Sequence, residues 1–310
     1  MKLRLVVGLA GLGAMFSSAA AFAIPIAPSA ASPAPIVATA ETGAPGAHLA
    51  FGSTLLVDAR LGHASLPSGG GAAETYLFAT VTGIDSAPAK APPVDLALVI
   101  DRSGSMKGRR MTNAMAAANT AVDRMKDGDT VLVVSFDTQA QTVLEPTVLT
   151  PVSRATIKAA IDGIRLGGDT CISCGLEEGK RALDRAPGGS DRVRRMLLLS
   201  DGVTNNGIRD VAGLRSLASL IREQSCAVTT IGVDLDYDEK VMSAIATEAN
   251  GNHYFVANSD TLSSVFTQEF EQLSSTVARD AALVVEPAPG VEVDEVFDRA
   301  FRREGRRIVV

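Results

Sequence analysis

Three oxygen-bearing side chains stand at alternate positions directly after a strongly apolar run. Residues 94–100 read Val-Asp-Leu-Ala-Leu-Val-Ile, which is typical of a buried strand, and Asp101, Ser103 and Ser105 follow in the pattern D-x-S-x-S. One carboxylate and two hydroxyls suit a hard divalent cation, Mg²⁺ first, with Mn²⁺ or Ca²⁺ as alternatives. An isolated pattern of this kind also fits a loop that caps a helix, because Ser and Asp accept hydrogen bonds from backbone N–H groups.

Two further segments end in oxygen donors and favour the metal interpretation. Residues 167–170 read Gly-Gly-Asp-Thr before an amphipathic stretch, and the apolar run 196–199 ends in Ser-Asp-Gly at 200–202. Together with D-x-S-x-S, these segments resemble the metal-ion-dependent adhesion site of the von Willebrand factor A (vWA) domain. In that family the second loop contributes a threonine and the third an aspartate. The resemblance implies a ligand set of Asp101, Ser103, Ser105, Thr170 and Asp201.

An α/β domain must position these loops. From Val94 onward, strand and helix patterns alternate, which predicts a doubly wound, Rossmann-like domain with a mainly parallel central sheet and helices on both faces. Strands are predicted at 94–100, 130–136, 141–148, 193–200, 226–233 and 253–256, and helices at 111–125, 153–164, 170–183, 210–223, 239–248 and 259–276. Ser153 is expected to cap the second helix and Thr170 to open the third. In open sheets of this type, ligands bind at the carboxyl ends of the strands.

The flanks of the predicted domain have a different character. Residues 24–48 are rich in Pro and Ala and are expected to form a linker. Residues 49–90 and 278–310 contain short alternating runs that predict strands, and we expect the two flanks to pack together as a small accessory β layer. The vWA resemblance covers residues 93–277. The whole arrangement is similar to bacterial exported A-domain proteins related to inter-alpha-trypsin inhibitor heavy chains and calcium-activated chloride channel homologues.

The amino terminus predicts export. Residues 1–23 begin with Lys2 and Arg4, continue through an apolar run and close on Ala-Phe-Ala, as a signal peptide with cleavage after Ala23 does. No other apolar run is long enough to cross a bilayer, so the mature chain is expected in the periplasm, the cell envelope or outside the cell. The chain carries a formal charge of −6, which argues against nucleic acid as a partner.

Two cysteines directly follow the predicted ligand threonine. Cys171 and Cys174 form a C-x-x-C pair, and in an exported protein a local disulfide is expected. A redox-active pair with a low thiol pKa is the alternative. A disulfide here would stiffen the loop that carries Thr170. Cys226 lies in a strand pattern and is predicted to be a buried unpaired thiol.

The resemblance implies a function in protein binding without catalysis. Asp101 and Asp201 would neutralise a divalent ion, and a Glu or Asp of a partner protein would complete its coordination shell. Two alternatives stay open: a metal-dependent hydrolase that uses the same acidic cluster, and a structural scaffold with a non-functional metal site. The hydrolase interpretation is weaker, because the sequence places no histidine near these loops and has no G-x-S-x-G motif.

Overall fold

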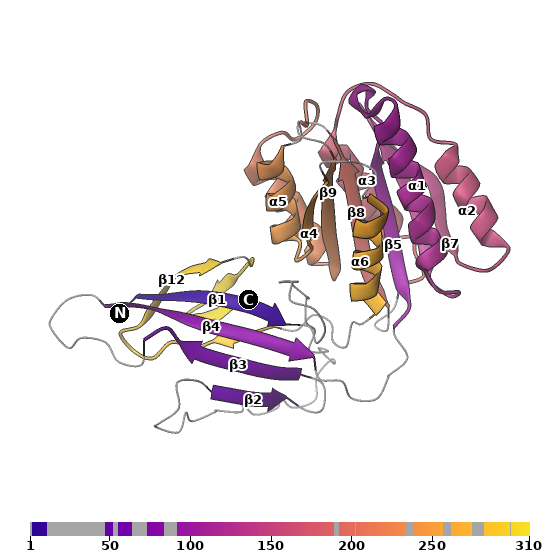
Figure 1. Ribbon diagram of the computed structural model, residues 1–310. Helices are drawn as coiled ribbons and strands as arrows, with labels where there is room; N and C mark the ends of the chain where they lie inside the picture. The colour runs from indigo at the N-terminus through magenta and orange to yellow at the C-terminus, as the bar shows by residue number, and fades with distance from the viewer. Residues whose placement is uncertain are drawn as a thin grey trace. The chain divides into compact units, whose positions relative to one another are not determined.

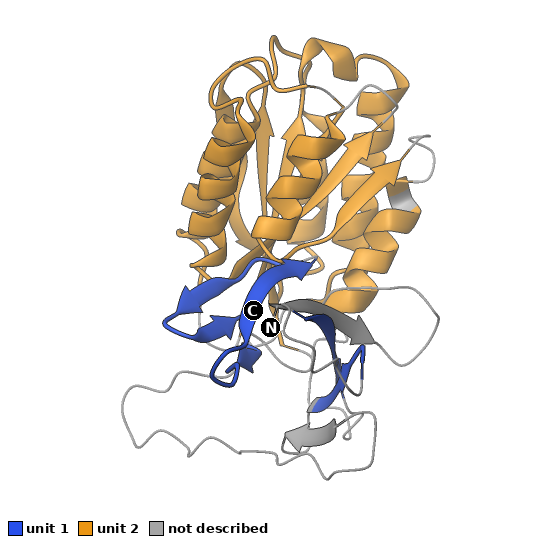
Figure 2. Cartoon of the chain, turned by 90° about the vertical axis from the view of Figure 1, so that its left-hand side faces the viewer, with its two compact units in different colours: residues 1–90, 277–310 blue, residues 91–276 orange. Residues whose placement is uncertain are grey.

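The chain forms two compact units. The computed structural model describes residues 2–10, 47–51, 55–63, 73–83, 92–188, 192–201, 203–233, 238–256, 262–274, 282–297 and 299–310. Unit 1 consists of residues 1–90 and 277–310, and unit 2 of residues 91–276 (Figure 2).

Unit 2 is built around a six-stranded sheet in the order β10-β9-β8-β5-β6-β7. The strands are β5 (Val94–Asp101), β6 (Thr130–Phe136), β7 (Ala140–Val148), β8 (Val193–Ser200), β9 (Cys226–Val233) and β10 (His253–Val256). All neighbours pair in parallel except β7, which is antiparallel to β6. The chain order reverses between β5 and β8, as in doubly wound sheets. The predicted fold class is confirmed, with one antiparallel edge strand.

Helices cover both faces of this sheet (Figure 1). The six helices are α1 (Arg109–Arg124), α2 (Ser153–Asp162), α3 (Ile172–Leu183), α4 (Val211–Arg222), α5 (Glu239–Glu248) and α6 (Leu262–Ser274). Leu96 and Leu98 of β5 point into the core shared with α1, α2 and α6, and Ala97 and Val99 into the core shared with α3, α4 and α5. Every residue of β5 is therefore buried, which explains why its sequence is almost continuously apolar.

Two glycines bring α3 unusually close to the sheet. A Cβ atom at Gly175 would lie 2.7 Å from the Phe136 ring, and one at Gly179 would lie 2.9 Å from a Val99 methyl. Larger residues would push the helix away from β5 and β6. The amino end of α3 is thus held against the carboxyl ends of these strands, where the predicted site lies.

Two predicted helix starts differ from the structure. Ser153 is the first residue of α2 and not its N-cap, and its backbone N–H donates to Thr150 Oγ1 at 3.0 Å while its own Oγ accepts from Thr150 N at 2.9 Å. The N-cap of α3 is Cys171, whose Sγ accepts from the N–H of Cys174 at 3.3 Å, and Thr170 precedes it. Neighbouring polar residues compete for these positions, and sequence alone does not decide between them.

Unit 1 contains a five-stranded sheet in the order β12-β1-β4-β3-β2 and a three-stranded sheet in the order β11-β14-β13. The strands are β1 (Lys2–Ala10), β2 (Ala47–Phe51), β3 (Leu55–Leu61), β4 (Glu74–Gly83), β11 (Val284–Val285), β12 (Glu292–Phe297), β13 (Arg302–Glu304) and β14 (Arg307–Val309). Leu77 of β4 packs against Val293 and Ile308, so side chains from both flanks share one small core.

The predicted signal peptide overlaps β1. Residues 2–10 pair in parallel with both β4 and β12 in the full chain, although the sequence predicts their removal. A Leu- and Val-rich run can form a strand as readily as a signal sequence. The predicted cleavage point and most of the predicted linker, residues 24–46, lie outside the described part of the chain. None of the helices in the described ranges is long and apolar enough to cross a bilayer.

Candidate metal centre

The two aspartates of the predicted site follow neighbouring strands. Asp101 ends β5 and Asp201 comes directly after β8, and these strands pair in parallel with Ile100 opposite Leu199. They meet where the strand order of the sheet reverses, so the chain after β5 continues to α1 on one face of the sheet and the chain after β8 continues to α4 on the other. Both carboxylates are buried, with exposed fractions of 0% for Asp101 and 2% for Asp201.

Hydrogen bonds link the first loop to Asp201. Asp101 Oδ1 accepts from the N–H of Ser103 at 2.8 Å, and its Oδ2 accepts from the hydroxyl of Ser200. Ser103 Oγ and Ser105 Oγ lie 3.0 Å apart. Ser105 Oγ in turn donates to Asp201 Oδ1 at 2.9 Å. The structure thus brings four of the five predicted residues into one continuous hydrogen-bonded cluster.

Thr170 joins this region through the backbone of its loop. The N–H of Gly167 donates to Arg102 O at 2.7 Å, and the N–H of Gly104 donates to Gly168 O at 3.0 Å. On the other side, the N–H of Thr170 donates to Asn205 Oδ1 at 2.9 Å. The Thr170 loop is therefore held between the loop after Asp101 and the loop after Asp201, and Thr170 itself is buried.

The buried position of Asp101 raises the cost of keeping this carboxyl group charged. Burial raises the pKa of Asp101 from 3.8 to about 6, and the negative charge of Asp201 adds to this effect. Hydrogen bonds from Ser200 and Ser103 act in the opposite direction. A nearby cation would remove this penalty, because an opposite charge favours the ionised form of a carboxyl group.

An arginine places a positive charge beside Asp201. Arg110 Nη1 lies 2.8 Å from Asp201 Oδ2 and also donates to Ser105 O at 3.0 Å. Neither Arg110 nor Ser200 was predicted from the sequence to contact the site. Two consecutive arginines follow the D-x-S-x-S loop, but the sequence does not tell which of them turns toward the site.

The donor set fits a hard cation. Two buried carboxylates and three hydroxyls, those of Ser103, Ser105 and Thr170, come from loops that contact one another, and a guanidinium already stands against one carboxylate. Among the described residues there is no group of three or more His, Cys, Asp or Glu side chains that could hold a metal ion. A softer ion that needs imidazole or thiolate ligands finds fewer matching donors in this cluster.

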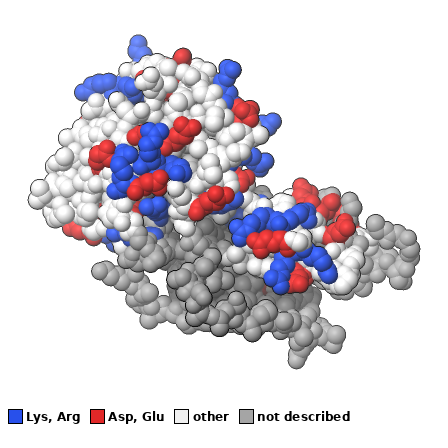
Figure 3. Space-filling model, turned by 180° about the vertical axis from the view of Figure 1, so that it is seen from behind, with Lys and Arg blue, Asp and Glu red and all other residues white. Residues whose placement is uncertain are grey.

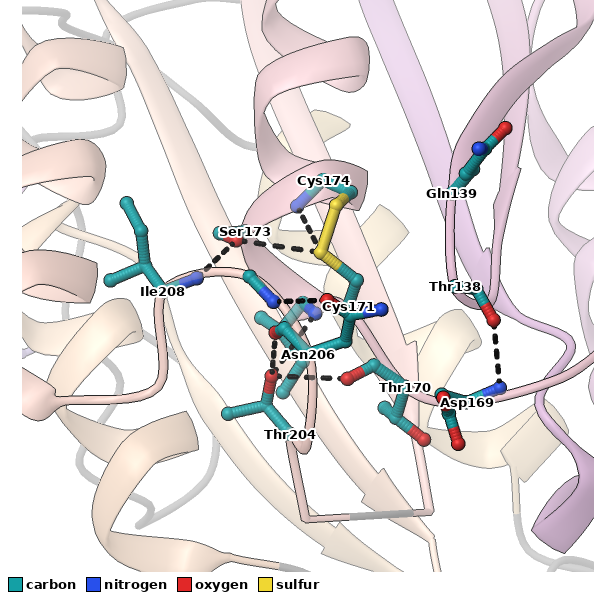
Figure 4. The surroundings of a disulfide bond; sticks show 12 residues. Thr138, Gln139, Asp169, Thr170, Cys171, Ser173, Cys174, Thr204, Asn206 and Ile208 are labelled. Carbon is teal, nitrogen blue, oxygen red and sulfur yellow. Dashed lines mark hydrogen bonds between the residues drawn. A yellow bond between two sulfur atoms is a disulfide. The ribbon is translucent and has the colours of Figure 1, made fainter.

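The predicted disulfide is present beside Thr170. Cys171 and Cys174 are bonded at the amino end of α3, and the loop after Asp201 runs along this bond (Figure 4). Thr204 Oγ1 donates to Thr170 O at 3.2 Å. Gly207 has φ of +68°, and a Cβ there would lie 2.5 Å from Cys171 Sγ. The second and third loops are therefore packed tightly around the disulfide.

The remaining cysteine and a histidine lie away from this edge of the sheet. Cys226 begins β9 and is a buried free thiol, and burial raises its pKa to about 12. His253 begins β10, at the amino end of the sheet, and its Nδ1 lies 2.9 Å from Thr230 Oγ1. Burial lowers the pKa of this imidazole.

Residues 95–268, more than half of the chain, match the family model of the von Willebrand factor type A domain. The chain belongs to the vWA family. Proteins of similar sequence include an uncharacterized protein of Synechocystis (sll0103), which is 32% identical over 197 residues, 64% of this chain and 46% of that protein. The inter-alpha-trypsin inhibitor heavy chain H2 of the mouse is 24% identical over 225 residues, 70% of this chain and 24% of that protein.

Solved vWA structures share the fold. A von Willebrand factor type A protein from Catenulispora acidiphila superposes with a TM-score of 0.55 at 22% identity, covering 76% of this chain and 49% of that one. Proximal thread matrix protein 1 from the mussel byssus, whose metal-ion-dependent adhesion site holds zinc, gives a TM-score of 0.51 at 23% identity and covers 59% and 46%. vWA domains are generally interaction modules, and this one carries the fold on which such metal sites are built.

The vWA chain spans less than half the length of the curated relatives just named. The similarity therefore describes a shared domain. What the longer relatives do as whole proteins does not transfer with it.

Proposed function

We propose that this vWA domain is an exported interaction module that binds a protein partner through a divalent ion. The ion would be held by the five oxygen-bearing side chains of the three loops: Asp101, Ser103, Ser105, Thr170 and Asp201. The observation that carries the proposal is the hydrogen bond from Ser105 to Asp201, because it joins the first and third loops at their oxygen donors.

The donors define what the site can do. Asp101 and Asp201 supply two negative charges, and the hydroxyls of Ser103, Ser105 and Thr170 add neutral dipoles. A bound divalent ion would supply an electrophilic centre with exchangeable water positions, and the carboxylate of a Glu or Asp from the partner would take one of them. This chain's residues would hold the ion, and the partner's carboxylate would complete its coordination.

Mg²⁺ is the proposed ion, with Mn²⁺ and Ca²⁺ as alternatives, because all five donors are oxygen atoms. Zinc occupies the corresponding motif of the mussel protein. Competition between Mg²⁺ and Zn²⁺ for the purified chain therefore belongs in the first experiment.

Binding is favoured over hydrolysis by the residue types around the site. The side chain that most often serves as a general acid or base is histidine. His253 begins β10 at the amino end of the sheet, away from the proposed ion site at the carboxyl ends of β5 and β8.

The mixed charges on one face of the protein do not favour nucleic acid as a partner. On the face drawn in Figure 3, Lys and Arg side chains are interspersed with Asp and Glu. Charged side chains of unit 2 pair with one another, as Arg185 does with Glu145 at 2.9 Å. Nucleic-acid binding is usually accompanied by a basic patch or stripe.

Export rests on residues 1–23, and a first test is mass spectrometry of the chain expressed with a secretion system. A mature amino terminus at Ile24 supports the proposal. Retention of β1 in the purified protein contradicts it.

Metal binding is tested by titration calorimetry and thermal melting of EDTA-treated protein with Mg²⁺, Mn²⁺, Ca²⁺ and Zn²⁺. Wild type should gain stability with rising ion concentration, since a ligand that binds the native state stabilises it by mass action. Asp101→Ala should abolish this gain. Asp169→Asn is the matched control, because Asp169 is an exposed carboxylate beside Thr170.

Partner binding is tested by affinity capture from the envelope fraction of the source cells. A partner that is retained by wild type and Asp169→Asn, released by EDTA and lost with Asp101→Ala supports the proposal. Equal recovery with all three proteins would contradict it.

A further inference from the structure

Arg110 occupies a position that the family's ligand set does not explain. Its Nη1 lies 2.8 Å from Asp201 Oδ2 and 3.0 Å from Ser105 O. Asp201 is 2% exposed, whereas the Arg110 side chain is 27% exposed. One end of the arginine thus reaches a buried carboxylate while the rest remains in contact with solvent.

The local backbone does not favour a cation here. Arg110 is the second residue of α1, and the amino end of a helix carries a partial positive charge that disfavours Lys and Arg. The acidic side chain that a helix start usually attracts is absent from the first turn of α1. The guanidinium is therefore held in place by Asp201 and by the carbonyl oxygen of Ser105.

The same two groups belong to the proposed ion site. Asp201 is one of its two carboxylates, and Ser105 is one of its hydroxyl residues. Two cations that draw on one carboxylate repel each other and share its charge, so the binding of one weakens the binding of the other.

We propose that Arg110 is a built-in counter-cation of Asp201 that competes with the divalent ion. This inference rests on the proposed function, since it requires an ion at Asp201. In the ion-free protein Arg110 stabilises the buried charge of Asp201. When an ion binds, the pair with Asp201 weakens, and the long, partly exposed side chain turns toward solvent. Arg110 thereby lowers the affinity of the site and keeps its loops assembled without the ion.

The inference is tested by measuring Mg²⁺ and Mn²⁺ affinity of wild type, Arg110→Gln and Lys107→Gln by calorimetry. Lys107 is exposed and lies between Ser105 and the start of α1, so Lys107→Gln removes a positive charge near Arg110 without removing the contact with Asp201. Arg110→Gln should bind the ion about fivefold more tightly or better, a coupling of ordinary size between two sites. Lys107→Gln should stay close to wild type.

Stability supplies a second measurement. Without ion, Arg110→Gln should melt at a lower temperature than wild type, because it leaves Asp201 buried without its cation. Saturating Mg²⁺ should remove most of this difference. A variant in which the deficit stays the same with and without Mg²⁺ would show a purely structural role and overturn the inference.

If Arg110→Gln does not fold, the inference is tested with Arg110→Lys and wild type. Arg110→Lys retains the positive charge but loses the guanidinium group that reaches both Ser105 O and Asp201. Its Mg²⁺ affinity should fall between that of wild type and the roughly fivefold higher affinity expected for Arg110→Gln. In wild type, modification of Arg110 by phenylglyoxal, read by peptide mass spectrometry, should increase when Mg²⁺ is added.

The outcomes separate the two proposals. Wild type that binds no divalent ion would overturn the proposed function and this inference with it. Two results would overturn only the role of Arg110, provided that wild type binds Mg²⁺. In the first, Arg110→Gln binds Mg²⁺ as tightly as wild type or more weakly. In the second, the Mg²⁺ affinity of Lys107→Gln changes as much as that of Arg110→Gln.

Discussion

Ser105 Oγ donates a hydrogen bond of 2.9 Å to Asp201 Oδ1 across 96 positions of the sequence. One partner lies in the loop after β5 and the other in the loop after β8. The two strands are neighbours in the sheet although a helix, two further strands and two more helices separate them in the chain. Because β5 and β8 are neighbours where the strand order of the sheet reverses, polar residues that are distant in the sequence form one cluster at their carboxyl ends.

Loss of the Ser105 hydroxyl should weaken both the cluster and the ion site. Ser105→Ala removes one hydrogen bond to a charged group, which costs about 1.5–3 kcal/mol when the acceptor is ionised and buried. It also removes one proposed ion ligand. We expect a lower free energy of unfolding in urea and a weaker Mg²⁺ affinity in calorimetry.

The matched control is Ser216→Ala in α4, where an exposed hydroxyl donates to Ala212 O within the helix. This variant should leave Mg²⁺ affinity unchanged. If Ser105→Ala also binds Mg²⁺ like wild type, Ser105 is not a ligand and serves only to join the loops.

The ion-free protein should lose stability as the pH rises through about 6. The folded state holds the proton of Asp101 more tightly than the unfolded state, because burial raises the pKa of this carboxyl group from 3.8 to about 6. The protonated Asp101 carboxyl group contributes up to about 3 kcal/mol to the free energy of unfolding below its unfolded-state pKa of 3.8. This contribution is lost as the pH rises through its folded-state pKa of about 6. Urea unfolding of EDTA-treated wild type and Asp101→Asn between pH 4 and pH 8 measures it.

Asp101→Asn should therefore be more stable than wild type at pH 7.5 without ion, and the advantage should shrink toward pH 4. A difference that stays constant with pH would contradict the assignment of this titration to Asp101. With Mg²⁺ present the wild type should gain more stability at pH 7.5 than at pH 5.5, because the proton and the ion compete for the same carboxylate.

Much of this fold could be predicted from the sequence because most of its strands are buried on both faces of the sheet. Continuous apolar runs such as 94–100 mark strands of a parallel sheet, and the helices between them show their own periodicity. The antiparallel direction of β7 was not predicted. Its residues are only partly buried, so its pattern does not distinguish an edge strand from an inner one.

The residue types of the candidate site could be predicted from the sequence, but the contacts between them could not. The positions of Asp101 and Asp201 follow from their places at strand ends. The contacts of Arg110 and Ser200 depend on side-chain directions that no spacing encodes. The start of α3 was predicted two residues too early, at Thr170 instead of Ile172. The structure uses Cys171 as the N-cap, and the loop after Asp201 binds Thr170 O.

Reduction of the disulfide should weaken ion binding. Cys171–Cys174 closes the turn that directly follows Thr170, and the loop after Asp201 is packed against it. Without this bond Thr170 gains freedom that ion binding must remove again. We expect Cys174→Ser to have a weaker Mg²⁺ affinity and a lower melting temperature, measured by calorimetry and thermal unfolding.

The control is performed in a Cys226→Ala background, so that no second thiol can exchange with Cys171. An oxidised protein with its disulfide intact should bind Mg²⁺ more tightly than the same protein in dithiothreitol. Equal affinities in both states would limit the disulfide to a structural role.

Substitution of Gly207 should loosen the same contact from the opposite side. Gly207 has φ of +68°, which residues with a Cβ rarely adopt, and an alanine methyl would collide with Cys171 Sγ and Ser173 Oγ. Gly207→Ala should therefore lower the free energy of unfolding by at least about 1 kcal/mol. It should also weaken Mg²⁺ binding, because Gly207 lies in the loop that follows Asp201 and that contacts Thr170 O through Thr204. Gly290→Ala, which has φ of +82° and open space around its Cβ position, tests the effect of backbone strain alone. It should lower stability without changing Mg²⁺ affinity, and a parallel loss of ion binding in both variants would contradict the coupling of Gly207 to the site.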